Sequence, residues 1–471
     1  MRRSLTATLS APLWLGLQLL AAPEAVAQPT ASTAKVPLVT LADADTKSAE
    51  TFGAILGLRH LPDGRVLVND GARRRLVLLD KGLGHGTVVI DSTSGTANSY
   101  GPRPSPLIHY LGDSSLFVDA ASTSLLVIDP QGKVQRVMSA PKPQDLRFLG
   151  AGQAYVDDRG RLVYRGAQMV TQNRSMLPGE RPRPIQPPDS APILRADFDT
   201  RQVDTIARVK LTGGMRMTMD QGPDGKMQMK MTVNPLQTVD DWAVLADGSL
   251  AFIRGQDYHV EVVNPQGEMA RGPKLPFDWK RLTDEDKQHL VDSARTALET
   301  QQKAQSANAT PGSFSIGGGG AGGGGGAGGG EQRVMIVMSG GGGGGAGNAT
   351  VGGGDGGGMP AGQPINIAAP KFESVPLNEI ADYYPAIRPG AARPDLDGNL
   401  WILTTTTAQS QSGELVYDVV NRKGELFQRV RLPKGRSVAG FGRDGIVYLM
   451  TGDRTNGFVL ERTSLKGVAS N

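Results

Sequence analysis

Cysteine is absent from the 471 residues of this chain. Its absence excludes disulfide bonds, thiolate metal sites, a cysteine nucleophile and a lipid anchor on cysteine. A strong excess of one charge is missing as well, because the formal net charge is only +4 and no cluster of lysine and arginine concentrates it. We therefore expect no nucleic-acid partner. Histidine is scarce, and no two of the five histidines lie at a metal-ligand spacing.

Long apolar segments are limited to one run near the N-terminus. Residues 11–22 (APLWLGLQLLAA) precede the small-x-small sequence Ala25-Val26-Ala27, an order typical of a signal peptide cleaved after Ala27. The general secretory route and, because of Arg2-Arg3, twin-arginine export are both open. The run is shorter than the ~20 apolar residues that span a membrane. The sequence therefore predicts a periplasmic or secreted protein with no integral membrane anchor.

The sequence is rich in a repeating strand pattern. From Leu58 to Ile90, four short runs of apolar and β-branched residues are separated by turns at 62–64, 71–74 and 81–86. The glycine of the first turn recurs at intervals of 48, 48 and 47 residues where no long insertion intervenes. A fixed period in the forties with four strands per unit is typical of propeller blades. The marker glycines are Gly64, Gly112, Gly160, Gly248, Gly398 and Gly445.

These units predict an all-β fold, a six-bladed β-propeller with four-stranded blades. The sixth unit lacks a fourth strand, and residues 35–42 (KVPLVTLA) form an unassigned strand near the N-terminus. An N-terminal strand that closes the last blade would leave no free sheet edge, so we place residues 35–42 there. The predicted organisation is a signal peptide over 1–27, a propeller over 35–467, an inserted hairpin over 212–232 and a further insertion over 278–366.

The two large insertions differ in composition. Residues 283–305 predict a helix, because a threonine–aspartate capping pair starts the segment and an apolar stripe follows at helical spacing. Residues 311–362 are glycine-rich and of low complexity, so they cannot bury enough apolar surface to offset chain entropy, and we predict disorder. Within them Val334 to Met338 forms an apolar island that we place beside the hairpin as an added strand.

The lengths of the connections divide the predicted propeller into two faces. With strands A to D counted outward from the axis, the A–B and C–D turns lie on one face and the B–C and D–A connections on the other. The A–B and C–D turns are short, which makes a lean face, and the long insertions all fall on the elaborated face. Function tends to lie where loops vary on a rigid scaffold. The long connections are 91–106, 166–190, 211–239 and 276–387.

Candidate binding residues lie in short stretches on the elaborated face. Arg254, Asp257, Tyr258 and His259 follow the second strand of the fourth unit. Arginine and aromatic side chains often anchor recognition sites, and this combination could bind an anionic or sugar-like ligand. Two alternatives are hydrogen bonding between neighbouring blades and a His259–Asp257 acid–base pair, although no nucleophile or metal set accompanies that pair. The other candidates are Tyr383, Tyr384 and Arg388 before the fifth unit, and Arg103.

A methionine-rich hairpin is the most unusual segment of the sequence. MRMTMD and KMQMKM flank the turn QGPDG, with the methionines on one face. Thioethers select Cu(I), which makes copper one alternative. The other interpretations are packing against the propeller and docking of a partner, because methionine fills irregular gaps. The six side chains are Met215, Met217, Met219, Met227, Met229 and Met231.

The stretch Asp395-Leu396-Asp397-Gly398-Asn399-Leu400-Trp401-Ile402 carries a family resemblance. It resembles the blade motif of secreted bacterial six-bladed propellers of the NHL/TolB-like group. The resemblance implies the propeller fold, and it implies either a non-enzymatic binding module or a calcium-dependent lactonase as the function. The lactonase set of carboxylate and amide metal ligands has no counterpart that can be placed here residue by residue.

The predicted function is that of an exported, non-catalytic scaffold that binds an unknown ligand or protein partner through the elaborated face. We expect a monomer and predict no cofactor. The alternative is a metal-dependent hydrolase, similar to a lactonase or esterase, with its site at the mouth of the propeller channel. That alternative would require calcium or another divalent metal.

Overall fold

The computed structural model describes most of the chain after the N-terminal region. The chain divides into two units, Met1–Lys35 and Val36–Asn471. The predicted signal peptide belongs to the first unit, which lies outside the described residues. The described residues are 36–93, 99–102, 105–119, 122–149, 153–166, 190–210, 215–221, 227–308, 313–317, 335–339, 367–405 and 414–465.

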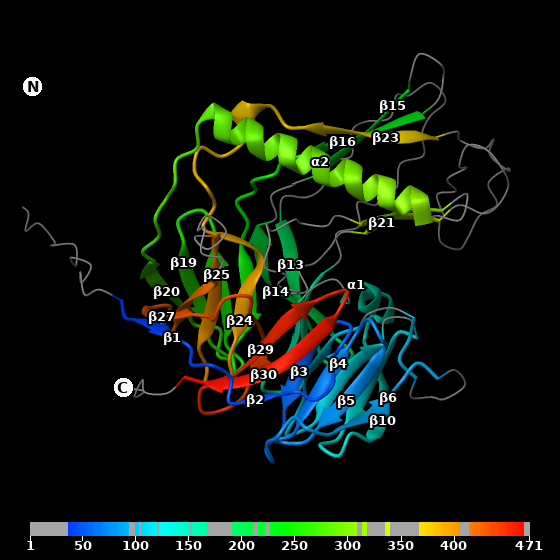
Figure 1. The fold of residues 1–471 in the computed structure, drawn as a ribbon, viewed down its shortest axis with the longest axis vertical. Coiled ribbons are helices and arrows are strands. Elements are labelled where there is room, and N and C mark those ends of the chain that lie inside the picture. Colours follow the sequence, from blue (N-terminus) through cyan, green and yellow to red (C-terminus); the bar gives the residue numbers. More distant parts are fainter. Residues whose placement is uncertain are drawn as a thin grey trace, which may run out of the picture. The chain divides into compact units, whose positions relative to one another are not determined.

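Six antiparallel sheets follow one another along the chain (Figure 1). The first three are β3 (Ile55–His60), β4 (Val66–Asp70), β5 (Arg75–Leu79) and β6 (Gly86–Ile90); β7 (Leu107–His109), β8 (Ser115–Asp119), β9 (Ser124–Ile128) and β10 (Val134–Ser139); and β11 (Ala154–Val156), β12 (Leu162–Arg165), β13 (Ser190–Ala196) and β14 (Val203–Lys210). The last three are β17 (Asp241–Val244), β18 (Leu250–Arg254), β19 (His259–Val263) and β20 (Met269–Lys274); β24 (Ile387–Pro394), β25 (Leu400–Thr404), β26 (Val416–Val420) and β27 (Leu426–Arg431); and β28 (Ser437–Phe441), β29 (Ile446–Asp453), β30 (Gly457–Ser464) and β2 (Thr46–Lys47).

The first strands of these sheets neighbour one another. They make contact in the order β28, β3, β7, β11, β17 and β24, so each sheet meets the next along its innermost strand. The remaining strands of each sheet follow in order toward the outside. This arrangement is a six-bladed β-propeller with four-stranded blades, and the predicted fold class is confirmed.

The blades are held together by apolar layers between them. Strands β4 and β8 are buried at every residue, because each blade packs against a neighbour on both of its faces. One cluster joins the first two blades through Leu67, Leu76, Phe117 and Leu126. A strand buried on both faces appears in the sequence as a continuous apolar run, whereas a strand with one face in solvent alternates apolar and polar residues.

The blade motif that carried the family resemblance has a structural role in the fifth blade. Asp395 accepts hydrogen bonds from the Asn399 backbone N–H (2.7 Å) and from the Trp401 indole Nε1–H (3.0 Å). Trp401 is buried between the fifth and sixth blades. Gly398 adopts φ +89°, a backbone conformation that side chains other than glycine rarely take. The motif therefore builds a tight turn and anchors a core tryptophan.

An N-terminal strand closes the sixth blade, as predicted, but residues 35–42 are not that strand. Strand β2 pairs antiparallel with β30, with Thr46 opposite Arg462. Strand β1 (Leu38–Thr40) instead pairs in parallel with β27 and adds a fifth strand to the outer edge of the fifth blade. The next residue, Leu41, is buried in the apolar cluster between the fifth and sixth blades. Residues 38–41 therefore pack where the fifth and sixth blades meet.

The methionine-rich hairpin forms a sheet of its own with a later segment. Strands β15 (Met215–Gln221) and β16 (Met227–Val233) pair antiparallel, and β16 pairs in parallel with β23 (Ile367–Ser374). Both β16 and β23 run toward the propeller, where one leads into β17 and the other into β24. The parallel pairing follows from that shared direction. The structure describes the backbone of β15 and β16 but not their methionine side chains, so the copper hypothesis stays a prediction.

The apolar island expected beside this hairpin pairs elsewhere. Strand β22 (Met335–Ser339) pairs with β21 (Ser313–Gly317), so our expectation that it extends the hairpin is wrong. Strand β23 takes that position and pairs in parallel with β16. Apart from these two strands, residues 311–362 lie outside the described residues.

The inserted helix α2 (Asp284–Asn308) starts with a reciprocal cap. The Thr283 backbone N–H donates to the Asp286 carboxylate (2.9 Å), and the Asp286 backbone N–H donates to the Thr283 hydroxyl (3.2 Å). The helix contacts β23 (Figure 1). A small core at its base contains Leu236, Leu282, Val291, Val375, Ile380 and Tyr384. The short helices are η1 (Pro143–Asp145), α1 (Leu146–Leu149) and η2 (Leu377–Glu379).

Among the described residues, no helix is long and apolar enough to cross a bilayer.

Candidate functional site

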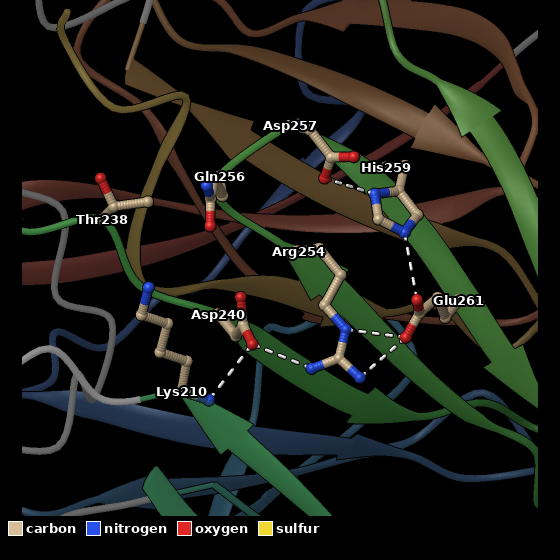
Figure 2. A pocket seen from close by; sticks show the side chains of 8 residues that line it. All are labelled: Lys210, Thr238, Asp240, Arg254, Gln256, Asp257, His259 and Glu261. Atoms are coloured by element: carbon tan, nitrogen blue, oxygen red, sulfur yellow. Dashed lines mark hydrogen bonds and ion pairs between the residues drawn. The ribbon is translucent and has the colours of Figure 1, made fainter. Parts of the chain in front are cut away.

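A polar pocket of about 310 Å³ opens on the elaborated face of the fourth blade. It lies where β14 of the third blade ends and where β18 turns into β19 (Figure 2). Both positions are on the side of the D–A and B–C connections. The residues on either side of the methionine-rich hairpin therefore flank the pocket. The lining residues are Lys210, Thr238, Asp240, Arg254, Gln256, Asp257, His259 and Glu261.

The strand geometry of β18 and β19 sets three of the side chains in place. His259 and Glu261 are two residues apart on β19, so both project from the same face of the strand. Arg254, the last residue of β18, lies directly opposite His259 in the ladder. Cross-strand pairs and their diagonal neighbours come within side-chain reach of one another. The sheet thus brings an arginine, a histidine and a glutamate together.

Arg254 joins two carboxylates from different parts of the chain. Its Nε donates to Glu261 Oε2 (2.7 Å) and its Nη1 donates to Asp240 Oδ2 (2.9 Å). Burial disfavours the charged guanidinium, but the hydrogen bonds that it donates to Glu261 and Asp240 outweigh this effect and raise the pKa of Arg254. Asp240 also accepts the backbone N–H of Gly255 (3.2 Å) and of Lys210 (3.1 Å). Because its guanidinium is engaged on both sides, Arg254 organises the pocket and is not a free anion ligand.

His259 lies between two other carboxylate oxygens. Its Nδ1 is 2.6 Å from Asp257 Oδ1 and its Nε2 is 3.2 Å from Glu261 Oε1, and the ring is only 3% exposed. A neutral imidazole has one N–H and donates to one of them, whereas an imidazolium donates to both. Arg271 donates to the second oxygen of Asp257 (3.2 Å). The arrangement can hold a proton close to the pocket wall.

The carboxylates of the pocket are held in fixed positions. Burial favours the neutral form of Glu261, but the hydrogen bonds from Arg254 and His259 outweigh it and lower the pKa of the carboxyl. Glu261 is therefore ionised at neutral pH. Asp240 is fixed by three donors, and Asp257 is held by His259 and Arg271. A ligand would meet preorganised acceptors that lose little conformational entropy on binding.

Two polar groups of the lining have no hydrogen-bond or ion-pair partner for their side chains within the described part of the chain. These are the Lys210 ammonium and the Gln256 amide, and both residues are exposed. Figure 2 shows both on the side of the pocket where Thr238 lies. Together they supply ammonium and amide donors and one amide acceptor to a bound molecule.

Tyr258 faces away from the pocket although it stands between two lining residues. It is fully buried, and its hydroxyl donates to Asp418 Oδ2 of the fifth blade (2.8 Å). Asp418 also accepts from Arg429 Nε (2.9 Å). The positive φ of Tyr258 (46°) turns the chain between β18 and β19 and directs the ring inward. Tyr258 thus connects neighbouring blades, which was the alternative interpretation of this stretch.

The second group of candidates does not line the pocket. Tyr384 is buried in the core at the base of α2, and its hydroxyl accepts a hydrogen bond from Arg388 Nη2 (2.7 Å). Tyr383 is 47% exposed, and its backbone bridges to Arg281. Arg103 lies outside the described residues. Of the predicted candidates, the structure therefore brings together Arg254, Asp257 and His259.

Several lining residues were not predicted from the sequence. Glu261 could have been found, because it follows His259 at the strand spacing of two residues. Lys210, Thr238 and Asp240 carry no local signal. They reach the pocket only because the third blade ends beside the fourth and the intervening segment returns to the same place.

Among the described residues, the inner strands present one buried carboxylate, Asp241, and the arginine that acts on it lies on the second strand β12. Asp241, at the start of β17, accepts the backbone N–H of Ala392 (2.8 Å), and burial raises its pKa to about 6. The positive charge of Arg165 opposes this rise in the pKa of Asp241. The pKa of Tyr155 is raised mainly by burial and secondly by the charge of Asp241. No group of three or more histidine, aspartate or glutamate residues arranged for a metal occurs among the described residues.

Comparisons with known proteins find matches among solved structures and nowhere else. No family model matches the sequence, and no curated protein matches it. Similar solved structures include the calcium-binding protein regucalcin from Agrobacterium tumefaciens (10% identity, 91% of this chain and 97% of that chain, TM-score 0.34). Another is virginiamycin B lyase from Staphylococcus aureus (10% identity, 89% and 98%, TM-score 0.30). A third is a luciferin-regenerating enzyme (9% identity, 89% and 94%, TM-score 0.32). The fold and site described above define the class: a six-bladed β-propeller with a polar pocket on its loop-elaborated face.

Proposed function

We propose that this propeller is an exported, non-catalytic binding protein that holds a small, hydroxyl-rich ligand of sugar type in the pocket of the fourth blade. The observation that carries the proposal is the fixed set of three carboxylates in the lining, Asp240, Asp257 and Glu261, beside one unpaired ammonium. Ionised carboxylates accept hydrogen bonds from hydroxyl groups, and amide and ammonium groups donate to them. An anionic ligand would meet repulsion from the same carboxylates, which favours the sugar-like ligand over the anionic one.

The non-catalytic character of the proposal rests on the composition of the site. The pocket has a histidine between two carboxylates but no serine, threonine or lysine held against that histidine as a nucleophile would be. The inner strands hold one buried carboxylate, Asp241, among the described residues, whereas a divalent-metal hydrolase needs several oxygen ligands.

The test is a binding screen on the full chain. A panel of neutral mono- and disaccharides would be measured by isothermal titration calorimetry against wild type, Gln256→Ala and Lys210→Ala. Each variant removes an exposed group without a side-chain partner, so the fold is expected to persist and affinity to fall about tenfold per lost hydrogen bond to the ligand. Lys133→Ala, an exposed lysine on a turn of the second blade, is the matched control and leaves affinity unchanged. Equal affinity in all variants would refute this pocket as the site.

Metal analysis of the purified protein separates this proposal from the hydrolase alternative. A metal-free protein that binds a sugar supports the scaffold. Near-stoichiometric calcium or zinc, together with turnover of lactones or esters, would replace it with the hydrolase.

Export and oligomeric state complete the proposal. We propose cleavage after Ala27, which N-terminal sequencing of periplasmic or secreted protein would test by finding Gln28 first. We also propose a monomer, which light scattering on the purified protein would test.

A further inference from the structure

A second polar cluster lies on the lean face, away from the pocket. Strand β3 contacts both β28 and β7, so the inner strands of the sixth, first and second blades are neighbours. At the lean-face end, β3 finishes with Arg59 and His60 and β7 finishes with His109. The turn between β28 and β29 adds Arg443. Three consecutive blades thus bring cationic and imidazole groups to one place.

Arg59 is a buried cation with weak partners. It is only 7% exposed, yet its contacts are long: Nε to Ser115 Oγ (3.3 Å) and Nη2 to the Ser114 carbonyl (3.5 Å). No carboxylate forms an ion pair with it among the described residues. Burial is the main effect that lowers the pKa of Arg59 to about 10. The negative charge of Asp113 opposes this shift, and the positive charge of Arg443 adds to it. A guanidinium has five donors, and burying a charge without partners is costly. Arg59 therefore has donors to offer.

His109 lies beside this guanidinium. Ser115, which receives the Arg59 Nε contact, is the ladder partner of His109. Burial, followed by the charges of Arg59 and Arg443, lowers the pKa of His109 to about 4, against the opposing effects of the Tyr110 backbone and Asp113. Taken as a whole residue, His109 is nevertheless exposed to solvent. We therefore expect His109 to lie near the end of the axial channel, where protein surrounds a side chain that water can still reach.

Arg443 approaches from the other side of β3. A Cβ placed on the preceding residue, Gly442, would lie 3.1 Å from His60 Nδ1, and that nitrogen is 2.9 Å from the Tyr448 hydroxyl.

Burial and then the charges of Arg59, Arg443 and Arg462 lower the pKa of His60, while Asp63 opposes them. Asp63 is itself paired with Arg65 at 2.6 Å. Both imidazoles are therefore neutral at neutral pH, and the cluster keeps the charges of two guanidinium groups against the one carboxylate of Asp113.

We propose that Arg59, Arg443 and His109 form a binding site for a small tetrahedral oxyanion, phosphate or sulfate, at the lean-face end of the axis. Guanidinium groups match the geometry of such anions and hold them through paired N–H donors. A neutral imidazole adds a further donor without requiring a proton from solvent. A bound dianion would supply the buried Arg59 with the counter-charge that the protein does not provide. The site is separate from the pocket of the fourth blade, so neither proposal depends on the other.

The histidines report on this site directly. The chain has five, so their imidazole nuclei can be followed individually by ¹⁵N–¹H correlation NMR. Inorganic phosphate, added to the full chain at constant ionic strength, is expected to shift the His109 signals and to raise the pKa of His109, because the anion offsets the nearby guanidinium charges. His289, on α2, serves as the internal control and does not respond. Sulfate reproduces the response if the site takes oxyanions of this shape, and acetate does not.

One pair of variants decides the assignment. Arg443→Gln changes an exposed side chain, so folding is retained, and phosphate binding measured by calorimetry is expected to weaken about tenfold. Arg454→Gln changes another exposed arginine of the same blade, in the turn between β29 and β30, and leaves phosphate affinity unchanged. Failure of phosphate to move the His109 signals, or equal phosphate affinity in Arg443→Gln and wild type, would overturn the proposal. Sugar binding in the fourth blade would be unaffected in either case.

Discussion

Removing the Tyr258 hydroxyl gives the sharpest test of how the fourth and fifth blades are joined. In Tyr258→Phe the ring still fills its position, beside Phe277 at 5.7 Å between ring centroids, and only the hydrogen bond to Asp418 is lost. Tyr258 is 0% exposed and Asp418 is 2% exposed, so water cannot replace the lost donor. Hydrogen bonds to charged groups contribute about 1.5–3 kcal/mol, and we expect a loss of that size in the free energy of unfolding near neutral pH.

The loss should depend on pH in a defined direction. Burial raises the pKa of Asp418, although Arg429 and Tyr258 oppose that effect. A carboxyl whose pKa is higher in the folded protein costs stability where it is ionised, and this cost disappears as pH falls below the unfolded value. Removing the Tyr258 donor raises the folded pKa further. The difference between variant and wild type therefore grows as pH rises through the two folded pKa values and shrinks as pH falls toward the unfolded value of about 4.

Urea denaturation at several pH values measures both effects. The midpoint of Tyr258→Phe should fall while the slope m stays the same, because the surface exposed on unfolding does not change. Tyr383→Phe is the matched control, since Tyr383 is 47% exposed, and it should lie within about 0.5 kcal/mol of wild type. A loss in Tyr258→Phe no larger than in this control, or one that grows as pH falls, would refute the reasoning.

Three further predictions concern the pocket, the axis and the turns. Arg254→Leu leaves the Asp240 and Glu261 carboxylates without their main partner and should cost about 2 kcal/mol near pH 7 by urea denaturation. The pKa of Glu261 is lower in the folded protein, so its carboxylate adds to the free energy of unfolding above the unfolded pKa, and this stabilisation is lost as pH falls through the folded pKa. The destabilisation in Arg254→Leu should therefore decline in acid, and a destabilisation that does not change with pH would contradict this. The ¹³C carboxyl signal of Asp241 should titrate near pH 6, and a midpoint at or below 4 would show that burial does not control it. Gly248→Ala should destabilise by about 1 kcal/mol or more, because φ is +83° and the new Cβ would lie 3.1 Å from Asp158; no loss in the urea midpoint would contradict the strain argument.

The pocket shows how far local pattern reaches toward a site. Arg254, Asp257 and His259 were selected from one short stretch, because residues that flank a tight strand connection must end up close together. The same stretch left two interpretations of Tyr258 open, a ligand contact and a hydrogen bond between neighbouring blades. Its neighbours line the pocket, but its positive φ and its bond to Asp418 direct it into the core. Alternation along a strand predicts two faces and does not say which face a residue in a turn will take.

The sequence by itself determined the repeating unit of this protein. The glycine spacing, the Asp-Gly turns and the alternating apolar runs are local features, and each fixes backbone conformation within a few residues. They were sufficient to predict six four-stranded blades, closure of the last blade by an N-terminal strand, and one face with long connections.

Only the tertiary structure decided which distant segments meet. Residues 38–40 and 46–47 are both short strands near the N-terminus, and their positions in the fifth and sixth blades depend on where Leu41 finds a buried site between those blades. Lys210 and Asp240 reach the pocket, and Arg59 and Arg443 reach the lean-face cluster, from separate blades. Contacts of this kind arise from the packing of whole blades, so no periodicity or motif in the chain encodes them locally.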